Sequence, residues 1–399
     1  MRTYLKIHLP FIAAALMFGA CDKDGDENKA VTKAEVISNY ADIVYLSYKD
    51  SYDKAVLMQT AINSFTDSPT EDGLTAAKTA WLASRDPYGQ TEAYRFYDGP
   101  IDNATDGPEG QLNAWPMDEK YVDYVQGDAN SGIINNASLA INETAIKGWN
   151  EGAGGDVTSI GAGFDAEKAI ASGYHAIEFL LWGQDLSATG PGARPYTDYT
   201  TKSNADRRKE YLKLTTNILV ADLKSMMDAW DADTSTNYRN ATWLKLDENT
   251  ALTNMLKSIG MLAKGELGGE RIDTALTNKS QEDEHSCFSD NTNKDVWANA
   301  KGVQNVYLGT YGDKTGASLS NLVAAANATL DTQIKTELEE AVAAADALPL
   351  TFDQFITDSN SEGYKAAEAL VVKLQTIGNN LVKGADALGL GTISIELPE

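Results

Sequence analysis

The sequence predicts an all-α protein built from two packed, four-helix-like bundles. Only 10 of its 399 residues are proline, and β-branched residues seldom cluster, so most of the chain favours helix over sheet. Apolar residues recur at helical spacing over long stretches in both halves. Each half offers about four substantial helices, and helices in that number bury their apolar faces economically as bundles.

This pattern divides the chain into four segments. They are a signal peptide at 1–20, a flexible tether at 21–30, an N-terminal bundle at 31–195 and a C-terminal bundle at 196–399. Residues 187–203 contain two glycines and two prolines, which makes them the best candidate for the break between the bundles.

The first 20 residues have a basic start with Arg2 and Lys6, followed by an apolar run that is too short to span a membrane. Small residues directly before Cys21 resemble a bacterial lipoprotein signal, in which Cys21 is lipidated and becomes the new N-terminus. The alternative is ordinary secretion with cleavage nearby. The acidic stretch 22–28 resembles surface-export signals of Bacteroidetes lipoproteins. We therefore expect a lipid-anchored protein of the cell envelope, in the outer membrane, with surface exposure left open.

Two long helices are expected next. Residues 32–65 show one uninterrupted helical pattern, and Thr70 is a suitable cap for a second helix. Pro87 lies inside that second pattern. Because proline donates no amide hydrogen bond, we expect the helix to bend or restart there.

A central helix is predicted between Asp165, which can cap its start, and Gly183, which can end it. His175 and Glu178 fall about 60° apart on one face, while the rest of the second half is apolar nearly all round. That pattern indicates a helix buried in the core. Since an unpaired buried carboxylate is costly, Glu178 needs a proton, a cationic partner or a metal ion.

The second half predicts further helices. The pattern from 250 to 276 holds four glycines, which indicate a close crossing with another helix. Helices are expected after residue 204 and over 294–308, 319–348 and 363–388, with a loop around 282–290.

Three motifs carry a family resemblance. Residues 173–178 read Gly-Tyr-His-Ala-Ile-Glu, the G-x-H-x-x-E signature of the imelysin family, also called the M75 peptidase-like family. Residues 81–96 and 280–290 also resemble that family. The three stretches lie in order over more than half of the chain, so the resemblance covers most of it. It implies a function in iron acquisition.

The candidate metal ligands are His175, Glu178 and His285. Only three histidines exist, and His8 would leave with the signal peptide. Imidazole and carboxylate ligands suit a divalent or ferric ion, iron or zinc, which would arrive free or in a small metal-bearing ligand. Supporting roles fall to Arg85, Glu92, Arg95, Glu282, Asp283, Glu284 and Asp290. Arg85 and Arg95 would balance charge, and the loop around 282–290 would close over the site.

Two alternatives stay open. A metallopeptidase would use Glu178 as base or ligand, but zinc peptidases place two histidines one turn apart. Here Phe179 stands where the second histidine of H-x-x-E-H would be, so His285 would have to complete the set. A partner-binding lipoprotein would use the same polar cluster as a buried network without metal. Cys287 is read as a buried small residue rather than a nucleophile.

The formal net charge of −25 limits the partners. Such a surface repels nucleic acid and anionic lipid headgroups and attracts cations or basic partners. We therefore expect no nucleic-acid partner, and membrane contact through the lipid anchor alone. Solubility is the simplest use of this charge, and the sequence leaves the identity of any protein partner open.

Overall fold

A computed structural model of the protein describes residues 30–152, 165–187, 189–349 and 351–395. The predicted signal peptide, Cys21 and nearly all of the tether lie outside these residues. Val31–Glu399 form one compact unit. In the described ranges the strands are the short antiparallel pair β1 (Thr310–Tyr311) and β2 (Lys314–Thr315). The predicted all-α class is confirmed.

The helices follow one another along the chain with short connections. The α-helices are α1 (Lys33–Asp67), α2 (Glu71–Thr91), α3 (Glu109–Asn113), α4 (Glu119–Val122), α5 (Glu143–Trp149), α6 (Gly173–Trp182), α7 (Ala205–Ala229), α8 (Tyr238–Ala241), α9 (Glu248–Gly260), α10 (Thr274–Asn278), α11 (Thr292–Leu308), α12 (Leu319–Ala326), α13 (Ala328–Asp346), α14 (Phe352–Ile356) and α15 (Glu362–Ala387). The π-helix η8 (Met261–Asp273) continues α9, and short 3-10 turns are η1 (Glu92–Tyr94), η2 (Ile133–Asn135), η3 (Asn150–Gly152), η5 (Ala166–Lys168), η6 (Tyr196–Tyr199), η7 (Trp243–Lys245) and η9 (Gln281–Asp283).

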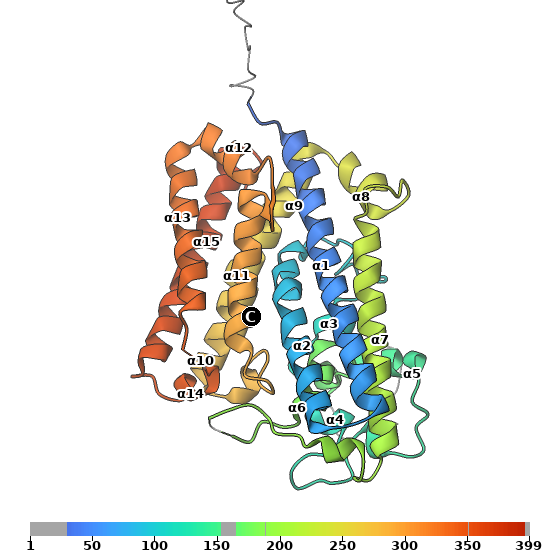
Figure 1. Ribbon diagram of the computed structural model, residues 1–399. Helices are drawn as coiled ribbons and strands as arrows, with labels where there is room; N and C mark the ends of the chain where they lie inside the picture. The colour runs from blue at the N-terminus through green and yellow to red at the C-terminus, as the bar shows by residue number, and fades with distance from the viewer. Residues whose placement is uncertain (1–29, 153–164, 188, 350, 396–399) are drawn as a thin grey trace, which may run out of the picture. The chain divides into compact units, whose positions relative to one another are not determined.

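One group of helices is formed by α1, α2, α6 and α7, in which α1 packs on α2 and α7 (Figure 1). The starts of α1 and α2 follow the predicted caps. Thr32 and Glu35 form a reciprocal capping box, and Thr70 accepts from the Gly73 amide. The expected restart at Pro87 is wrong, because α2 continues through it to Thr91. The helix is held by packing on both α1 and α11.

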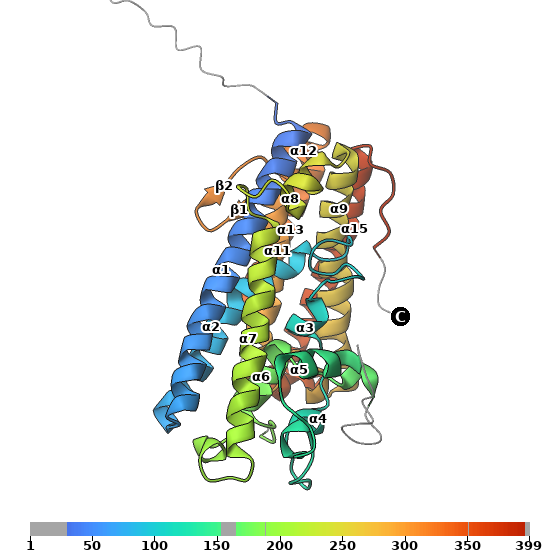
Figure 2. The same ribbon diagram turned by 90° about the vertical axis from the view of Figure 1, so that its right-hand side faces the viewer.

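The second group contains α9, η8, α11, α13 and α15, which lie together in both views (Figures 1 and 2). The predicted close crossing is present between η8 and α15. A Cβ on Gly378 would lie 2.7 Å from the Lys264 side chain, so the glycine permits the contact. The helix expected over 319–348 is two helices, because Asn327 ends α12 and its side chain caps α13.

The two groups meet where α2 packs against α11, and where η1 packs against both α9 and α11. The division of the chain at residue 195 stays a prediction. In space, α7 from the second half of the sequence packs on α1 from the first half.

The central helix is shorter than predicted, and this correction bears on the site. Asp165 caps only the turn η5, and α6 starts at Gly173. The amides of residues 171 and 172 both donate to the Asn150 side chain, which removes them from any longer helix. Gly173 has φ +87°, and a Cβ there would lie 2.7 Å from the Leu112 carbonyl oxygen. Only glycine fits this turn, which places the next residues of the motif.

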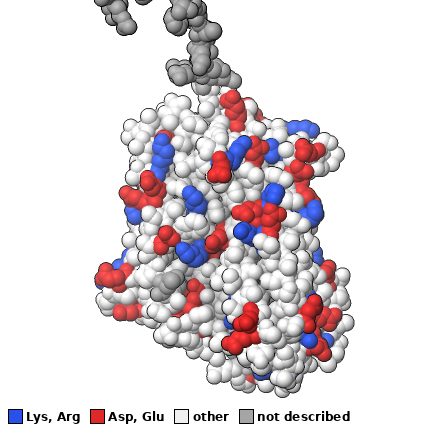
Figure 3. All heavy atoms as spheres, in the orientation of Figure 1, with Lys and Arg blue, Asp and Glu red and all other residues white. Residues whose placement is uncertain are grey.

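The surface agrees with the composition. Acidic and basic side chains are interspersed over the face seen in Figure 3. Each helix within the described ranges falls short of the length and apolarity that a membrane span requires.

Candidate metal centre

His175 and Glu178 lie on α6 and are completely buried. The Nδ1 atom of His175 lies 3.0 Å from Oε2 of Glu178, one helical turn away. The other carboxylate oxygen of Glu178 accepts from the backbone amide of Ser289 at 2.9 Å and from its hydroxyl at 2.6 Å. Glu178 therefore orients the His175 ring and ties α6 to the loop before α11.

His285 belongs to that same loop and is held by a second carboxylate. Its Nδ1 lies 3.0 Å from Oδ2 of Asp295 on α11, so a proton on Nδ1 donates to Asp295. Arg85 on α2 pairs with Asp295 at 2.6 Å and also donates to Oδ1 of Asn113 at 2.7 Å. The amide nitrogen of Asn113 then donates to Nε2 of His285 over a long 3.4 Å.

The two imidazole rings face each other. Their centroids are 4.6 Å apart, and the Trp115 ring lies 4.8 Å from His175. The Nε2 atom of His175 is buried and has no hydrogen-bond partner. An unpaired buried ring nitrogen is costly unless it carries a ligand. Each histidine thus has a carboxylate at Nδ1 and a weakly used or unused Nε2.

Burial sets the protonation of this group. It raises the pKa of Glu178 to about 8, and it lowers the pKa of His285 to about 4. Burial, followed by the nearby charges of His285 and Arg85, holds the pKa of His175 well below its usual value. Burial alone would raise the pKa of Asp295, but Arg85 and His285 outweigh it and keep that pKa far below normal. Both imidazoles are neutral at pH 7 and can act as metal ligands.

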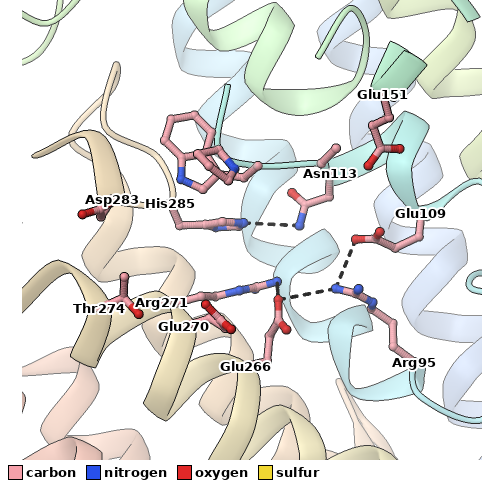
Figure 4. Close-up of a pocket in the computed structure, with 13 residues that line it drawn as sticks. Arg95, Glu109, Asn113, Glu151, Glu266, Glu270, Arg271, Thr274, Asp283 and His285 are labelled. Atoms are coloured by element: carbon pink, nitrogen blue, oxygen red, sulfur yellow. Dashed lines mark hydrogen bonds and ion pairs between the residues drawn. The ribbon is translucent and has the colours of Figure 1, made fainter. Parts of the chain in front are cut away.

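A cavity of about 390 Å³ opens beside His285 (Figure 4). Arg95 and Arg271 lie on its wall, and three glutamates surround them. Arg95 contacts Glu92 at 2.9 Å and Glu109 at 3.1 Å, while Arg271 contacts Glu92 at 2.7 Å and Glu266 at 2.8 Å. The lining residues are Arg95, Glu109, Asn113, Ala114, Trp115, Pro116, Glu151, Glu266, Glu270, Arg271, Thr274, Asp283 and His285.

The family assignment comes from a sequence model described as Peptidase_M75: Imelysin, which matches residues 44–381. The chain belongs to the imelysin family. That match includes all the helices that supply His175, Glu178, Arg85 and Asp295, as well as the loop of His285.

Named relatives agree with the imelysin assignment. The chain is 24% identical over 319 residues to "Iron-regulated protein A" of Synechococcus elongatus, covering 78% of this chain and 73% of the relative. A crystal structure from Parabacteroides distasonis, described as an iron-regulated protein A precursor, aligns with TM-score 0.65 and 21% identity over 90% of this chain and 96% of that one. An imelysin-like protein from Psychrobacter arcticum aligns with TM-score 0.56 and 14% identity over 91% and 98%. These two structures share the fold.

The supporting residues predicted from the imelysin motifs separate into three places. Arg85 lies at His285 but pairs with Asp295 rather than with Glu178. Glu92 and Arg95 pair with each other on the far side of the cavity, and Asp283 lines it. Glu282 is exposed. Glu284 and Asp290 face a separate group of aspartates, described below.

Sequence reasoning missed several residues that complete the imelysin site. They are Asn113, Trp115, Arg271, Ser289 and Asp295. Asp295 could have been found from its place in the first turn of the helix that follows the third motif. The others carry no spacing signal, because distant segments supply them.

The predicted metal ligands do not form a closed three-ligand set. Among the described residues, the three-membered group whose ligand atoms lie within 4.8 Å of one another is Asp185, Asp290 and Asp353. A metal at His175 and His285 would thus keep other positions for water or a small ligand. Burial raises the pKa of the Cys287 thiol well above its usual value, which agrees with the interpretation of Cys287 as a buried small residue.

Proposed function

We propose that this imelysin-family protein binds a metal ion, iron or zinc, between His175 and His285 and serves iron acquisition at the cell envelope. The observation that carries the proposal is Nε2 of His175, which is buried without a partner, its ring 4.6 Å from that of His285. A neutral imidazole whose Nδ1 donates to a carboxylate presents Nε2 as a metal ligand. His285 has the same arrangement with Asp295.

The chemistry of these groups fits iron or zinc. Two imidazoles with carboxylates behind them suit either metal, and the lack of a sulfur ligand disfavours copper(I). We expected Glu178 to be a direct ligand. Since both of its oxygens are engaged by His175 and Ser289, we propose an orienting role for it instead. A bound cation would also favour the ionised form of Glu178.

The charge of the cavity supports a cation as the ligand rather than an anionic chelate. Its two arginines, Arg95 and Arg271, are already paired with Glu92, Glu109 and Glu266. Burial would raise the pKa of Glu92, but Arg95 and Arg271 outweigh it and lower that pKa to about 2. The wall also carries other acidic side chains, so it attracts a hydrated metal ion.

The link to iron rests on the name of the Synechococcus relative, "Iron-regulated protein A". The link to the envelope rests on the sequence before and after Cys21, for which we propose lipidation. Mass spectrometry of the mature protein should find an N-terminus at a lipid-modified Cys21. An unmodified N-terminus at another position would show ordinary secretion instead.

Metal binding should depend on the tautomer of His175. In Glu178→Gln the side-chain oxygen is needed by the Ser289 amide and hydroxyl, so the new NH₂ group faces Nδ1 of His175. Nδ1 must then accept, the proton moves to Nε2, and the ligand is lost. We expect a roughly 10–100-fold weaker affinity for zinc or iron(II), and no measurable binding in His175→Ala, by isothermal titration calorimetry.

The matched control is Glu368→Gln, which changes an exposed glutamate on α15 and should bind metal like the wild type. Equal binding by all four proteins would contradict the proposed site. Metal-dependent cleavage of an unfolded protein substrate that is lost in Glu178→Gln would instead establish the metallopeptidase alternative.

A further inference from the structure

Three aspartates from distant parts of the chain converge on one point outside the histidine site. Asp185 follows α6, Asp290 lies in the loop before α11, and Asp353 is in the first turn of α14. One carboxylate oxygen from each lies within 4.8 Å of the others. Like charges repel at this separation, so the arrangement is costly unless protons or a cation neutralise it.

Glu284 provides an independent indication that a ligand is missing. Its side chain is 1% exposed, and its Oε1 is buried without a hydrogen-bond partner. Oε2 accepts only from the hydroxyl of Thr292, at 3.2 Å. Burial, followed by the charges of Asp353, Asp290 and Asp185, acts against its ionised form, so the carboxylate lies within range of all three.

Asp290 is unsatisfied as well. Both of its carboxylate oxygens are shielded from solvent and have no hydrogen-bond partner. Its backbone has φ +57°, a conformation that non-glycine residues adopt at a cost. Burial and then the negative charges of Asp353 and Asp185 raise its pKa to about 7. The groups that act on Asp290 therefore leave room for a positive charge.

We infer that Asp185, Asp290, Asp353 and Glu284 form a binding site for a hard divalent cation, with calcium as the expected ion. Carboxylate oxygens alone are the ligands that calcium prefers, and its variable coordination tolerates carboxylates from three separate segments. Asp185 and Asp290 are only partly buried, which leaves the ion a route from solvent.

Such an ion would brace the loop of the histidine site. Asp290 directly follows Ser289, whose amide and hydroxyl bind Glu178, and Asp185 lies three residues after the end of α6. Calcium would thus join the loop, the end of α6 and α14. This cation site uses none of the proposed metal ligands, so it holds or fails independently of the proposed function.

Residues 31–399, which form one compact unit, should bind about one Ca²⁺ per chain in isothermal titration calorimetry. A hundredfold excess of calcium over its Kd should raise the Tm by roughly 4 °C. In Asp290→Asn and Asp353→Asn this shift should disappear. Because the repulsion is relieved, both variants should melt at or above the Tm of the calcium-free wild type, so the loss cannot be mistaken for misfolding.

Asp386→Asn is the matched control, since it changes an exposed aspartate on the last turn of α15 and should keep the full calcium shift. His175→Ala should also keep it, which separates this site from the histidine site. The inference is overturned if the wild type binds no Ca²⁺ at millimolar concentration, or if Asp290→Asn and Asp353→Asn bind it as well as the wild type does.

Discussion

Replacing Asp295 with asparagine is expected to lower the free energy of unfolding by about 3–5 kcal/mol. The carboxylate is 2% exposed and forms the ion pair of Arg85, which is itself 1% exposed. It also accepts from Ser286 at 2.5 Å and from His285 at 3.0 Å. The substitution leaves a buried guanidinium without its counter-ion, and urea denaturation would measure the loss.

Asp346→Asn is the control for this experiment. Asp346 pairs with Lys294 of the same helix α11 at 3.1 Å, but both side chains are at least half exposed. Exposed pairs contribute about 0–1 kcal/mol, so this variant should unfold almost like the wild type. Similar losses in the two variants would mean that the Arg85–Asp295 pair is not buried as described.

Asp123→Asn should have a comparable effect in the other part of the molecule. Asp123 is fully buried between two arginines, at 2.7 Å from Arg194 and 2.6 Å from Arg208. The second counter-ion of Arg194 is Asp198, at 3.1 Å. Loss of the Asp123 charge leaves two buried cations with one carboxylate, which we expect to cost about 3–5 kcal/mol.

The effect of Asp123→Asn should also depend on pH. Burial alone would raise the pKa of Asp123, but Arg194 and Arg208 outweigh it and lower that pKa below its usual value. The stabilisation is therefore complete above the unfolded-state pKa of about 3.9 and is lost as the pH falls through the folded-state pKa. The difference between wild type and variant should be constant near neutral pH and should shrink below about pH 4.

Asp128→Asn provides the control from the same stretch of chain, because Asp128 is exposed and its side chain accepts only from the Asn130 amide. It should change the unfolding free energy by less than about 0.5 kcal/mol at every pH. A pH-independent loss in Asp123→Asn would contradict the charge argument.

The sequence predicted the helices well where local signals decide them. Thr32 and Thr70 start α1 and α2 as their capping chemistry requires. It failed where tertiary contacts decide. Asn150 takes the amides that would extend α6 toward Asp165, and packing on both sides keeps Pro87 inside α2. Neither partner can be identified from helical periodicity.

The candidate site followed the same rule. His175, Glu178 and His285 lie together, and they were identifiable because buried histidine and glutamate at helical spacing need partners. The partners themselves came from elsewhere: Ser289 for Glu178 and Asp295 for His285. An arginine was expected beside Glu178, but Arg85 instead neutralises Asp295. Pairings between distant segments depend on the fold and leave no spacing pattern in the sequence.

The central claim is that His175 and His285 hold one metal ion. Crystals of residues 31–399 soaked in iron(II) or zinc, with diffraction data collected at the absorption edge of the metal, test it most directly. The account predicts an anomalous peak about 2.0–2.2 Å from Nε2 of both histidines, with Nδ1 of each still bonded to Glu178 or Asp295. A peak at other residues only, or no peak while both rings keep their present positions, would contradict it.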